Sequence, residues 1–405
     1  MTDRPPPKKP FVVLRGAALA SEASGQRGHF TNARAGHSPE PGSSARAALA
    51  SEASGQRGHF TSARAGHSPE PGSSARAAPA SEASDHFTSA RTAPAGDALR
   101  GAVVAIGNFD GVHRGHRAVI AAALARARML HRPAAALTFE PHPRRFFQPA
   151  AHLFRLTDER ARLRLLAATG LDGAIVLRFD AAMAGLSAEA FVTRILVQQL
   201  AVTGVAIGFD FHFGLNRAGS PDYLAAQGAR LGFAVDVVPR FEDAGRPVRS
   251  GPIRAALAAG NIGEATELLG YPWFVSAEVV HGDKRGRDLG YPTANLRLDP
   301  SCALAHGIYA VRVGLGGRRL DGVASFGRRP TFDDGAVLLE IFLFDFSGDL
   351  YGEVIDVAFI EWIRPELKFD SIAELVRRMD EDSRIARAAL ARMPDAFPRL
   401  GEVTD

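Results

Sequence analysis

The stretch Gly107-Asn108-Phe109-Asp110-Gly111-Val112-His113-Arg114-Gly115-His116 decides the fold of this chain. It follows a strand-like apolar run, Val103–Ile106, and leads into the helical pattern Arg117–Leu130. Its glycines let the backbone approach a ligand, and a helix start offers free N–H groups to phosphates. His113 and His116 face the same way on a helical turn, where they can donate hydrogen bonds to a leaving pyrophosphate. A lone His-x-x-His pair is more often solvent-exposed or a weak metal site, so the whole string carries the prediction of a nucleotide site.

Strand and helix signals alternate on both sides of this stretch. The alternation predicts a doubly wound parallel α/β sheet, a Rossmann-like fold. The expected strands are Phe11–Leu14, Val103–Ile106, Ala134–Phe139, Ala174–Leu177, Val205–Ile207 and Ala234–Val238. The expected helices are Arg117–Leu130, Glu159–Ala168, Ala188–Gln199, Pro221–Leu231, Ile253–Ala259 and Ile262–Leu269.

The pattern of secondary-structure signals changes after Pro272, where short strands separated by Gly-rich turns begin. This pattern predicts a small antiparallel β-barrel with a closing amphipathic helix over about Ser371–Ala391. The expected strands are Val275–Val280, Tyr309–Val313, Gly322–Ser325, Val337–Phe344 and Ile355–Phe359.

A second Gly-rich segment, His281–Asn295, lies in this region. Its glycines allow a loop to wrap phosphates, and Thr293 and Asn295 point the same way if the chain is extended. Two neutral oxygens together with ATP phosphates suit Mg²⁺. Gly290–Asn295 alone could also be an ordinary turn. Glu340, a second candidate residue of this region, could by itself be a surface residue of a strand.

The first stretch resembles the signature of the nucleotidylyltransferase superfamily, and in its longer form the FMN adenylyltransferase module of bacterial bifunctional riboflavin kinase/FAD synthetases. Thr138–Pro143 and Gly208–Gly214 resemble further segments of that module. The resemblance implies that His113 and His116 are catalytic and that a flavin site contains His142, Pro143, Asp210 and Phe211. The ATP-binding residues that it implies are Gly107, Asn108, Phe109, Asp110, Gly111, Gly115, Ser250 and Arg254.

One departure from that family lies at Val248–Arg254. The family usually has a Ser-Ser-Thr-like run here that grips ATP phosphates. Ser250 and Arg254 match the pattern, but Arg249 replaces a serine and Gly251 removes a hydroxyl. We expect adenylyl transfer to be weakened rather than lost.

The C-terminal region resembles the riboflavin kinase module of the same family, whose Pro-Thr-Ala-Asn motif carries the nucleotide-bound Mg²⁺. The resemblance makes Thr293 and Asn295 the metal ligands and Glu340 the catalytic base. It also implies an ATP site at Gly282, Arg285, Gly286, Gly290 and Pro292, and a flavin site at Arg364, Glu366 and Phe369. Both modules occur in the family's order, over about residues 97–390.

A 30-residue repeat interrupts the N-terminal part of the chain: Ala17–Glu22 returns at Ala47–Glu52 and, as AAPASE, at Ala77–Glu82. Its Ala, Ser, Gly, Pro and Arg cannot bury enough surface to offset the entropy of ordering, so we predict a disordered insert rather than a solenoid. The predicted organisation is residues 1–16 with the first strand, 17–95 insert, 96–271 adenylyltransferase, 272–395 kinase and 396–405 tail.

Composition narrows the function classes. The single cysteine, Cys302, excludes an intrachain disulfide and suits a reducing cytoplasm, and no apolar run reaches the length of a membrane span. A net charge of +4 without a compact basic block gives no strong sign of nucleic-acid binding. We therefore expect a cytoplasmic enzyme, with a homo-oligomer as one option. The resemblance implies that its substrates are riboflavin, FMN and ATP and that its products are FMN and FAD.

Three alternatives stay open from the sequence. The chain could be a riboflavin kinase with an impaired adenylyltransferase module, as Arg249 and Gly251 suggest. It could be a flavin-binding sensor without turnover, against which Glu340, Thr293, Asn295 and the loop histidines argue. A nucleotidylyltransferase for another acceptor would leave the C-terminal region unexplained.

Overall fold

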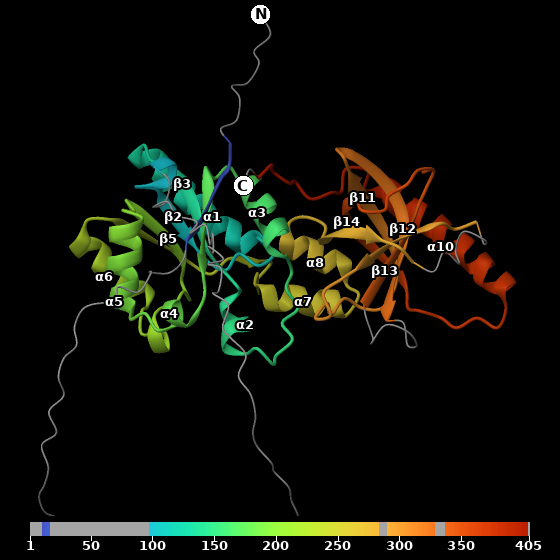
Figure 1. The fold of residues 1–405 in the computed structure, drawn as a ribbon, viewed down its shortest axis with the longest axis horizontal. Coiled ribbons are helices and arrows are strands. Elements are labelled where there is room, and N and C mark those ends of the chain that lie inside the picture. Colours follow the sequence, from blue (N-terminus) through green and yellow to red (C-terminus); the bar gives the residue numbers. More distant parts are fainter. Residues whose placement is uncertain (1–9, 17–96, 283–289, 329–336, 404–405) are drawn as a thin grey trace, which may run out of the picture. The chain divides into compact units, whose positions relative to one another are not determined.

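Six parallel strands form the N-terminal sheet of the computed structural model, which describes residues 10–16, 97–282, 290–328 and 337–403. The strand order is β1-β4-β3-β2-β5-β6, so the predicted doubly wound sheet is confirmed (Figure 1). The bounds are β1 Val12–Gly16, β2 Val103–Ile106, β3 Ala134–Glu140, β4 Gly173–Arg178, β5 Gly204–Gly208 and β6 Ala234–Val238. The repeat insert and the loop at 283–289 lie outside the described residues.

The chain reverses direction across this sheet at β2. It runs from β2 through β3 to β4 on one side and returns to β5 and β6 on the other. The carboxyl ends of β2 and β5 therefore flank a topological switch point, where open α/β sheets bind their ligands. The Gly107–His113 loop follows β2, and the loop after Gly208 follows β5.

Helices connect and cover these strands. The longer ones are α1 Arg114–Leu130, α3 Glu159–Ala167, α6 Pro221–Leu231, α7 Ser250–Ala258 and α8 Ile262–Leu269; the short ones are α2 Pro143–Phe147, α4 Ala181–Ala184, α5 Ala188–Ala190, and the 3-10 turns Asp97–Leu99 and Leu215–Arg217. The helix predicted at Ala188–Gln199 is divided, since Phe191–Gln199 is π-helical. A small hairpin, β7 Glu242–Asp243 and β8 Arg246–Pro247, was not predicted.

Alternation along the buried strands divides the core in two. Val103 and Ala105 of β2 belong to one apolar cluster, and Val104 and Ile106 belong to the other. The second cluster lies under the π-helical segment, whereas the first continues through α7 and α8 into the barrel. A strand that is apolar on both faces is expected for a parallel sheet covered on both sides.

The C-terminal region is a closed antiparallel barrel in the order β10-β13-β12-β11-β14-β9, which confirms the predicted barrel. Its strands are β9 Phe274–Val280, β10 Thr293–Arg297, β11 Gly307–Leu315, β12 Arg318–Arg328, β13 Val337–Leu343 and β14 Val354–Arg364, followed by α10 Ile372–Arg392. Gly316 and Gly317 both have positive φ, as a two-residue hairpin turn requires, and they let β11 and β12 extend beyond the predicted ends.

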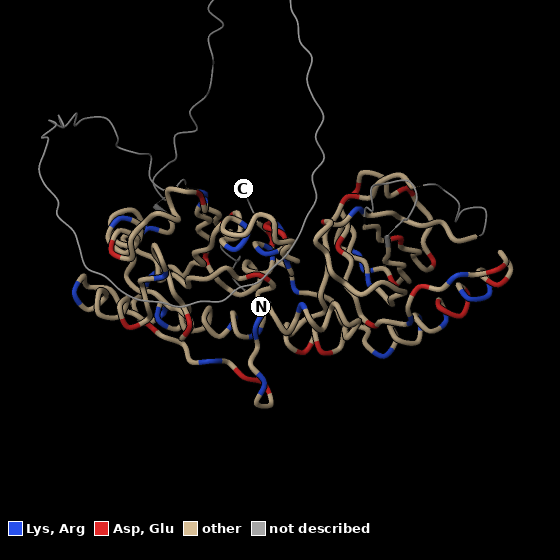
Figure 2. Tube along the Cα trace, turned by 90° about the horizontal axis from the view of Figure 1, so that it is seen from below, with Lys and Arg blue, Asp and Glu red and all other residues tan. Residues whose placement is uncertain are grey.

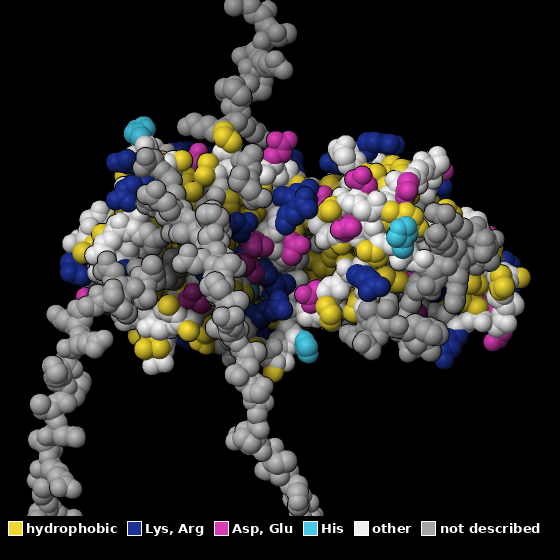
Figure 3. Space-filling view, viewed as in Figure 1, with side chains coloured by type: hydrophobic (Ala, Val, Ile, Leu, Met, Phe, Trp, Pro, Cys, Tyr) yellow, Lys and Arg dark blue, Asp and Glu magenta, His cyan; other side chains and the backbone are white. Residues whose placement is uncertain are grey.

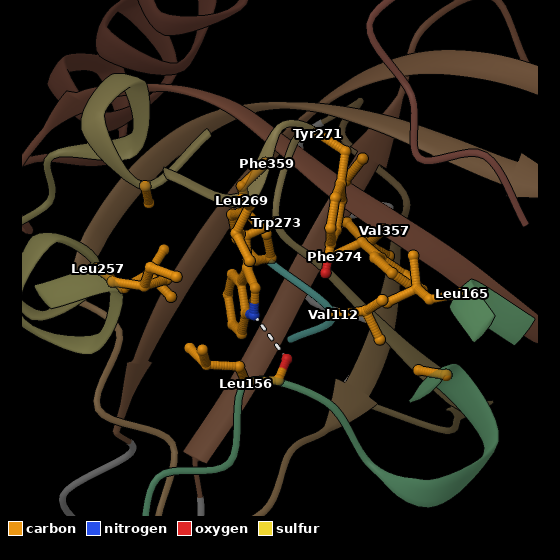
Figure 4. Close-up of a cluster of buried hydrophobic side chains, with 14 of the residues drawn as sticks. Val112, Leu156, Leu165, Leu257, Leu269, Tyr271, Trp273, Phe274, Val357 and Phe359 are labelled. Atoms are coloured by element: carbon orange, nitrogen blue, oxygen red, sulfur yellow. Dashed lines mark hydrogen bonds between the residues drawn. The ribbon is translucent and has the colours of Figure 1, made fainter. Parts of the chain in front are cut away.

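Trp273 contacts both the barrel and the N-terminal part of the chain. Its indole N–H donates to the carbonyl oxygen of Leu156 at 2.8 Å, and its ring stacks on Phe359 of β14 (Figure 4). The side chain is only 1% exposed. Arg164 of α3 adds two hydrogen bonds to Asp356 of β14, at 2.6 and 2.7 Å. The two regions therefore share one core.

Charged side chains of both signs are spread over the described surface. Blue and red residues follow one another along α10 in Figure 2, and both signs are interspersed on the face in Figure 3. Within the described ranges, no helix combines the length and apolar character that a membrane crossing requires.

Candidate active sites

The loop from Gly107 to His113 joins the end of β2 to α1 in a tightly constrained path. Gly111 has φ +83°, and a Cβ there would lie 2.8 Å from Leu156 Cδ1. A Cβ on Gly115 would lie 2.9 Å from the carbonyl oxygen of Val248. Phe109 and Val112 also adopt positive φ, which is costly for such side chains and accumulates at functional sites. The predicted glycine requirement therefore has a structural cause at Gly111 and Gly115.

His113 and His116 stack on each other at the start of α1, with ring centroids 3.5 Å apart. His113 caps the helix: its Nδ1 accepts the backbone N–H of His116 at 3.2 Å, and α1 begins at Arg114. Burial lowers the pKa of His113 to about 4, with Asp110 opposing and Arg254 adding to the shift. Burial, His113 and Arg162 also hold the pKa of His116 well below its ordinary value.

Both imidazoles are therefore neutral at physiological pH. Because Nδ1 of His113 accepts a hydrogen bond, its ring proton lies on Nε2, which is left as a donor. Nδ1 of His116 is buried and has no hydrogen-bond partner among the described residues. The pair can thus offer neutral N–H donors to an anion.

Asp110 is buried and hydrogen-bonds to three other residues of this site. Its Oδ1 accepts hydrogen bonds from the backbone N–H and the hydroxyl of Thr157, at 3.0 and 3.3 Å. Its Oδ2 is paired with Arg254 of α7, and its backbone oxygen accepts the Ser250 hydroxyl at 3.1 Å. The structure thus brings Ser250 and Arg254 to the loop, as predicted.

The altered segment lies at the start of α7. Arg249 occupies the N-cap position and makes no side-chain capping hydrogen bond. A Cβ on Gly251 would have no atom within 4 Å, so the missing hydroxyl would point into open space. The departure from the family pattern therefore removes two hydroxyl groups, and at Gly251 no other atom takes the place of the missing side chain.

The residues predicted to bind flavin lie beyond β3 and β5, the two neighbours of β2. His142 caps α2 by accepting the backbone N–H of Arg144 at 3.1 Å, and Pro143 is the first residue of that helix. Burial lowers the pKa of His142 to about 4, which Asp110 opposes and nearby arginines reinforce. Asp210 is exposed. The ring of Phe211 stacks on that of Phe213, with the ring centroids 5.4 Å apart.

An arginine network beneath the loop was missed by the sequence analysis. Arg162 of α3 donates to the carbonyl oxygen of Asn108 at 3.3 Å and to Glu140 at 2.8 Å. Arg155 holds the same carboxylate with two bonds, at 2.7 and 3.0 Å. Burial would raise the pKa of Glu140, but hydrogen bonds and charges from the two arginines lower it on balance. In sequence, Arg162 is one of several arginines on a helix, and nothing marks it as buried.

In the barrel, Asn295 and Glu340 face each other across β10 and β13, and Ser325 of β12 pairs with Glu340. Directly paired residues share a face of the sheet, so the three form one polar row. The neighbouring pair Ala294 and Ile341 points into the barrel core. Thr293 lies two residues before Asn295 and shares its face. The predicted catalytic base and both predicted metal ligands are therefore brought together.

Asn295 is 5% exposed, and its Oδ1 has no hydrogen-bond partner among the described residues. Its Nδ2 donates to the carbonyl oxygen of Thr293 at 3.3 Å. A Cβ on Gly282 would lie 2.4 Å from Nδ2, so only glycine fits against this amide. A buried oxygen without a partner is a suitable ligand for a hard cation such as Mg²⁺.

The other kinase residues are only partly placed. Gly290, with φ +80°, and Pro292 precede β10, whereas Arg285 and Gly286 lie outside the described residues. Arg364 is bound to Asp382 of α10 and lies 5.8 Å from the centre of the Phe369 ring. Glu366 packs on Gly327, and its carboxylate is 3.6 Å from His306.

A cavity of about 170 Å³ lies between the sheet and the barrel. Thr157, Trp273, Ser276, Arg297 and Cys302 are among its lining residues, whereas Glu340 and His116 are not. It borders the network beneath the nucleotide loop through Arg155 and Thr157, but it does not contain the predicted catalytic residues.

Comparison with known proteins assigns the two regions. The family model for FAD synthetase matches residues 96–251, and that for riboflavin kinase matches residues 269–390. A bifunctional riboflavin kinase/FMN adenylyltransferase from Pseudomonas fluorescens is 41% identical over 72% of this chain and 94% of its own length. One from Escherichia coli K12 is also 41% identical, over 71% of this chain and 92% of its own.

A solved structure shares the architecture. A crystal structure described as a macrolide-efflux protein from Streptococcus pneumoniae aligns with a TM-score of 0.65 and 33% identity, over 71% of this chain and 94% of that one. The likeness extends over most of both chains.

Proposed function

The chain belongs to the family of bifunctional riboflavin kinases/FMN adenylyltransferases and carries both activities, and we propose that Glu340 serves the kinase while the Gly107–His116 loop serves the adenylyltransferase. The observation that carries the kinase assignment is the buried Oδ1 of Asn295, which lies on the residue paired with Glu340 and has no hydrogen-bond partner in the described part of the chain. A time course of riboflavin, FMN and FAD with MgATP tests the scheme, because FMN should appear first and then be converted to FAD.

In the kinase step, Glu340 accepts the proton of the 5′-hydroxyl on the ribityl chain of riboflavin. The freed oxygen attacks the γ-phosphorus of ATP in line, giving FMN and ADP. A carboxylate base suits this step because the nucleophile is a neutral alcohol. Thr293 and Asn295 would hold Mg²⁺, which neutralises charge on the ATP phosphates when bound. The glycines before β10 let the backbone follow those phosphates.

In the adenylyl transfer, an oxygen of the FMN phosphate attacks the α-phosphorus of a second ATP. FAD forms and pyrophosphate leaves. No general base is required, because the nucleophile is already an anion. His113 donates from Nε2 to the leaving pyrophosphate, and His116, Ser250 and Arg254 complete the phosphate site. The neutral state of both histidines supports roles as hydrogen-bond donors rather than as acids.

Arg249 and Gly251 favour a second candidate function, a kinase whose adenylyltransferase is slow. The start of α7 lacks two hydroxyl groups that the family usually supplies, since Arg249 stands in place of a serine and the space at Gly251 is open. Comparing the rates of FMN and FAD formation on the same sample decides between them. A cytoplasmic location and a possible homo-oligomer remain proposals, tested by cell fractionation and by light scattering.

A further inference from the structure

A fully buried arginine lies directly beneath the nucleotide loop. Arg162 is 0% exposed, and it shares the Glu140 carboxylate with Arg155. Two guanidinium groups thus share one carboxylate, because the Asp110 carboxylate, which also attracts both of them, is already paired with Arg254. Burying an arginine is costly, and a single arginine would already neutralise Glu140. The second arginine therefore requires a separate explanation.

The hydrogen bonds of Arg162 suggest that explanation. Nη1 donates to the carbonyl oxygen of Asn108 at 3.3 Å, and Nη2 lies 3.5 Å from that of Phe139. The first carbonyl belongs to the nucleotide loop, and the second lies near the end of β3. Arg162 thus joins the loop after β2 to the end of its neighbour β3. Its positive charge also helps to keep His116 neutral.

We propose that Arg162 is a positioning residue for adenylyl transfer, which fixes the nucleotide loop through the Asn108 carbonyl and adds positive charge behind the ATP phosphates. This inference rests on the proposed role of the Gly107–His116 loop. Arg162 does not need to touch the substrate, because the strained loop and the first turn of α1 carry the donors. A loop displaced by about 1 Å loses about 10²-fold in rate.

The test compares two arginines that share one carboxylate. Arg162→Met and Arg155→Met each leave a neutral Arg–Glu140 pair, but only the first removes the bond to Asn108. We expect Arg162→Met to lower kcat for FAD formation from FMN by about 10²-fold, with the KM for ATP within about threefold. Arg155→Met should stay within about threefold of wild type in both constants. Riboflavin phosphorylation on the same chain should be unchanged in both variants, which controls for folding.

Arg162→Lys gives a second measure if the methionine variant also loses kinase activity. Lysine keeps the charge but lacks the planar fork, so it should recover only part of the rate. A wild-type kcat in Arg162→Met would overturn the inference, as would equal losses in Arg162→Met and Arg155→Met that follow their melting temperatures. If the unmodified chain makes no FAD from FMN, the proposed site assignment fails first and the inference fails with it.

Discussion

Asn295 and Glu340 face each other across β10 and β13, with the amide oxygen of Asn295 buried and unpartnered among the described residues. The pair puts a metal ligand and a base on one face of the barrel, so it separates two roles that mutation can test. Glu340→Gln keeps the shape of the side chain and removes its basicity. We expect FMN formation to fall about 10²–10⁴-fold, while FAD formation from added FMN stays within about twofold. Product analysis by liquid chromatography measures both rates.

Glu353→Gln is the matched control, since Glu353 is an exposed residue immediately before β14. It should leave both rates unchanged. Near-normal kinase turnover in Glu340→Gln would show that another group accepts the proton.

Asn295 should show a conflict between stability and function. Its orphaned Oδ1 is a buried polar atom that costs about 1–3 kcal/mol when nothing binds it. Asn295→Leu removes that atom at similar volume, so the melting temperature without ligands should stay equal or rise. Kinase kcat/KM should fall at least about 10²-fold, and Mg²⁺ added with ATP should raise the melting temperature less than in wild type, because only the adenylyltransferase site keeps its ATP-binding residues. Asn295→Leu also removes the hydrogen bond from Nδ2 to the carbonyl oxygen of Thr293, so a loss of stability larger than that one bond contributes, about 0.5–1.5 kcal/mol, would indicate that Oδ1 has a structural partner.

The stacked histidines predict a dependence of stability on pH. Burial lowers the pKa of His113 from 6.5 to about 4, so between these values the unfolded chain binds more protons than the folded one. The contribution of the neutral His113 to the free energy of unfolding is then fully present above pH 6.5, and it is lost as the pH falls toward 4. At pH 5 the loss from His113 alone is about 2 kcal/mol.

His113→Asn isolates this effect, because asparagine still caps the helix but does not titrate in this range. Its free energy of unfolding should fall less between pH 8 and pH 5 than that of wild type, and FAD formation should be lost. His152→Gln alters an exposed histidine and serves as the control. Equal pH slopes in His113→Asn and wild type would contradict the buried, neutral state.

The two tryptophans give a matched pair for the link between sheet and barrel. Trp273→Phe leaves the buried carbonyl of Leu156 without its donor and opens space in the shared core. We expect a loss of about 2 kcal/mol or more and two separate transitions in calorimetry. Trp362 has no hydrogen-bond partner at Nε1 among the described residues, so Trp362→Phe should cost much less. One unchanged transition in Trp273→Phe would show that other contacts suffice to unite the two regions.

The spacing of apolar residues along the sequence predicted most helices and strands, because burial on one or both faces of an element requires apolar residues at regular intervals. The cap of α1 was not predicted, because it is a histidine side chain, which is not a usual capping residue. Asp110 and Arg254 are 144 residues apart, and only the family resemblance could suggest that both belong to one site. The sequence gives no such signal for Arg162, since an arginine in a helix rich in charged residues is usually exposed. Its burial depends on Glu140 and Arg155, that is, on tertiary structure.

The first turn of α7 offers a gain-of-function prediction. A side chain at Gly251 would meet no atom within 4 Å, so threonine can be accommodated there. Arg249→Ser together with Gly251→Thr restores two hydroxyl groups where the family usually has them. Hydrogen bonds to charged phosphates contribute about 1.5–3 kcal/mol each, so kcat/KM for FAD formation should rise at least about tenfold. Kinase activity should not change, because these residues belong to the other site.

Gly263→Thr is the matched control for this variant. Gly263 also lies in the first turn of a helix, α8, and a Cβ there also meets no atom within 4 Å. It should leave FAD formation unchanged. If the double variant also leaves it unchanged while the wild type is slow, the slow step lies elsewhere, and the carbonyl held by Arg162 is the next place to look. If the wild type is already fast, the backbone N–H of Gly251 supplies what the hydroxyl would have added.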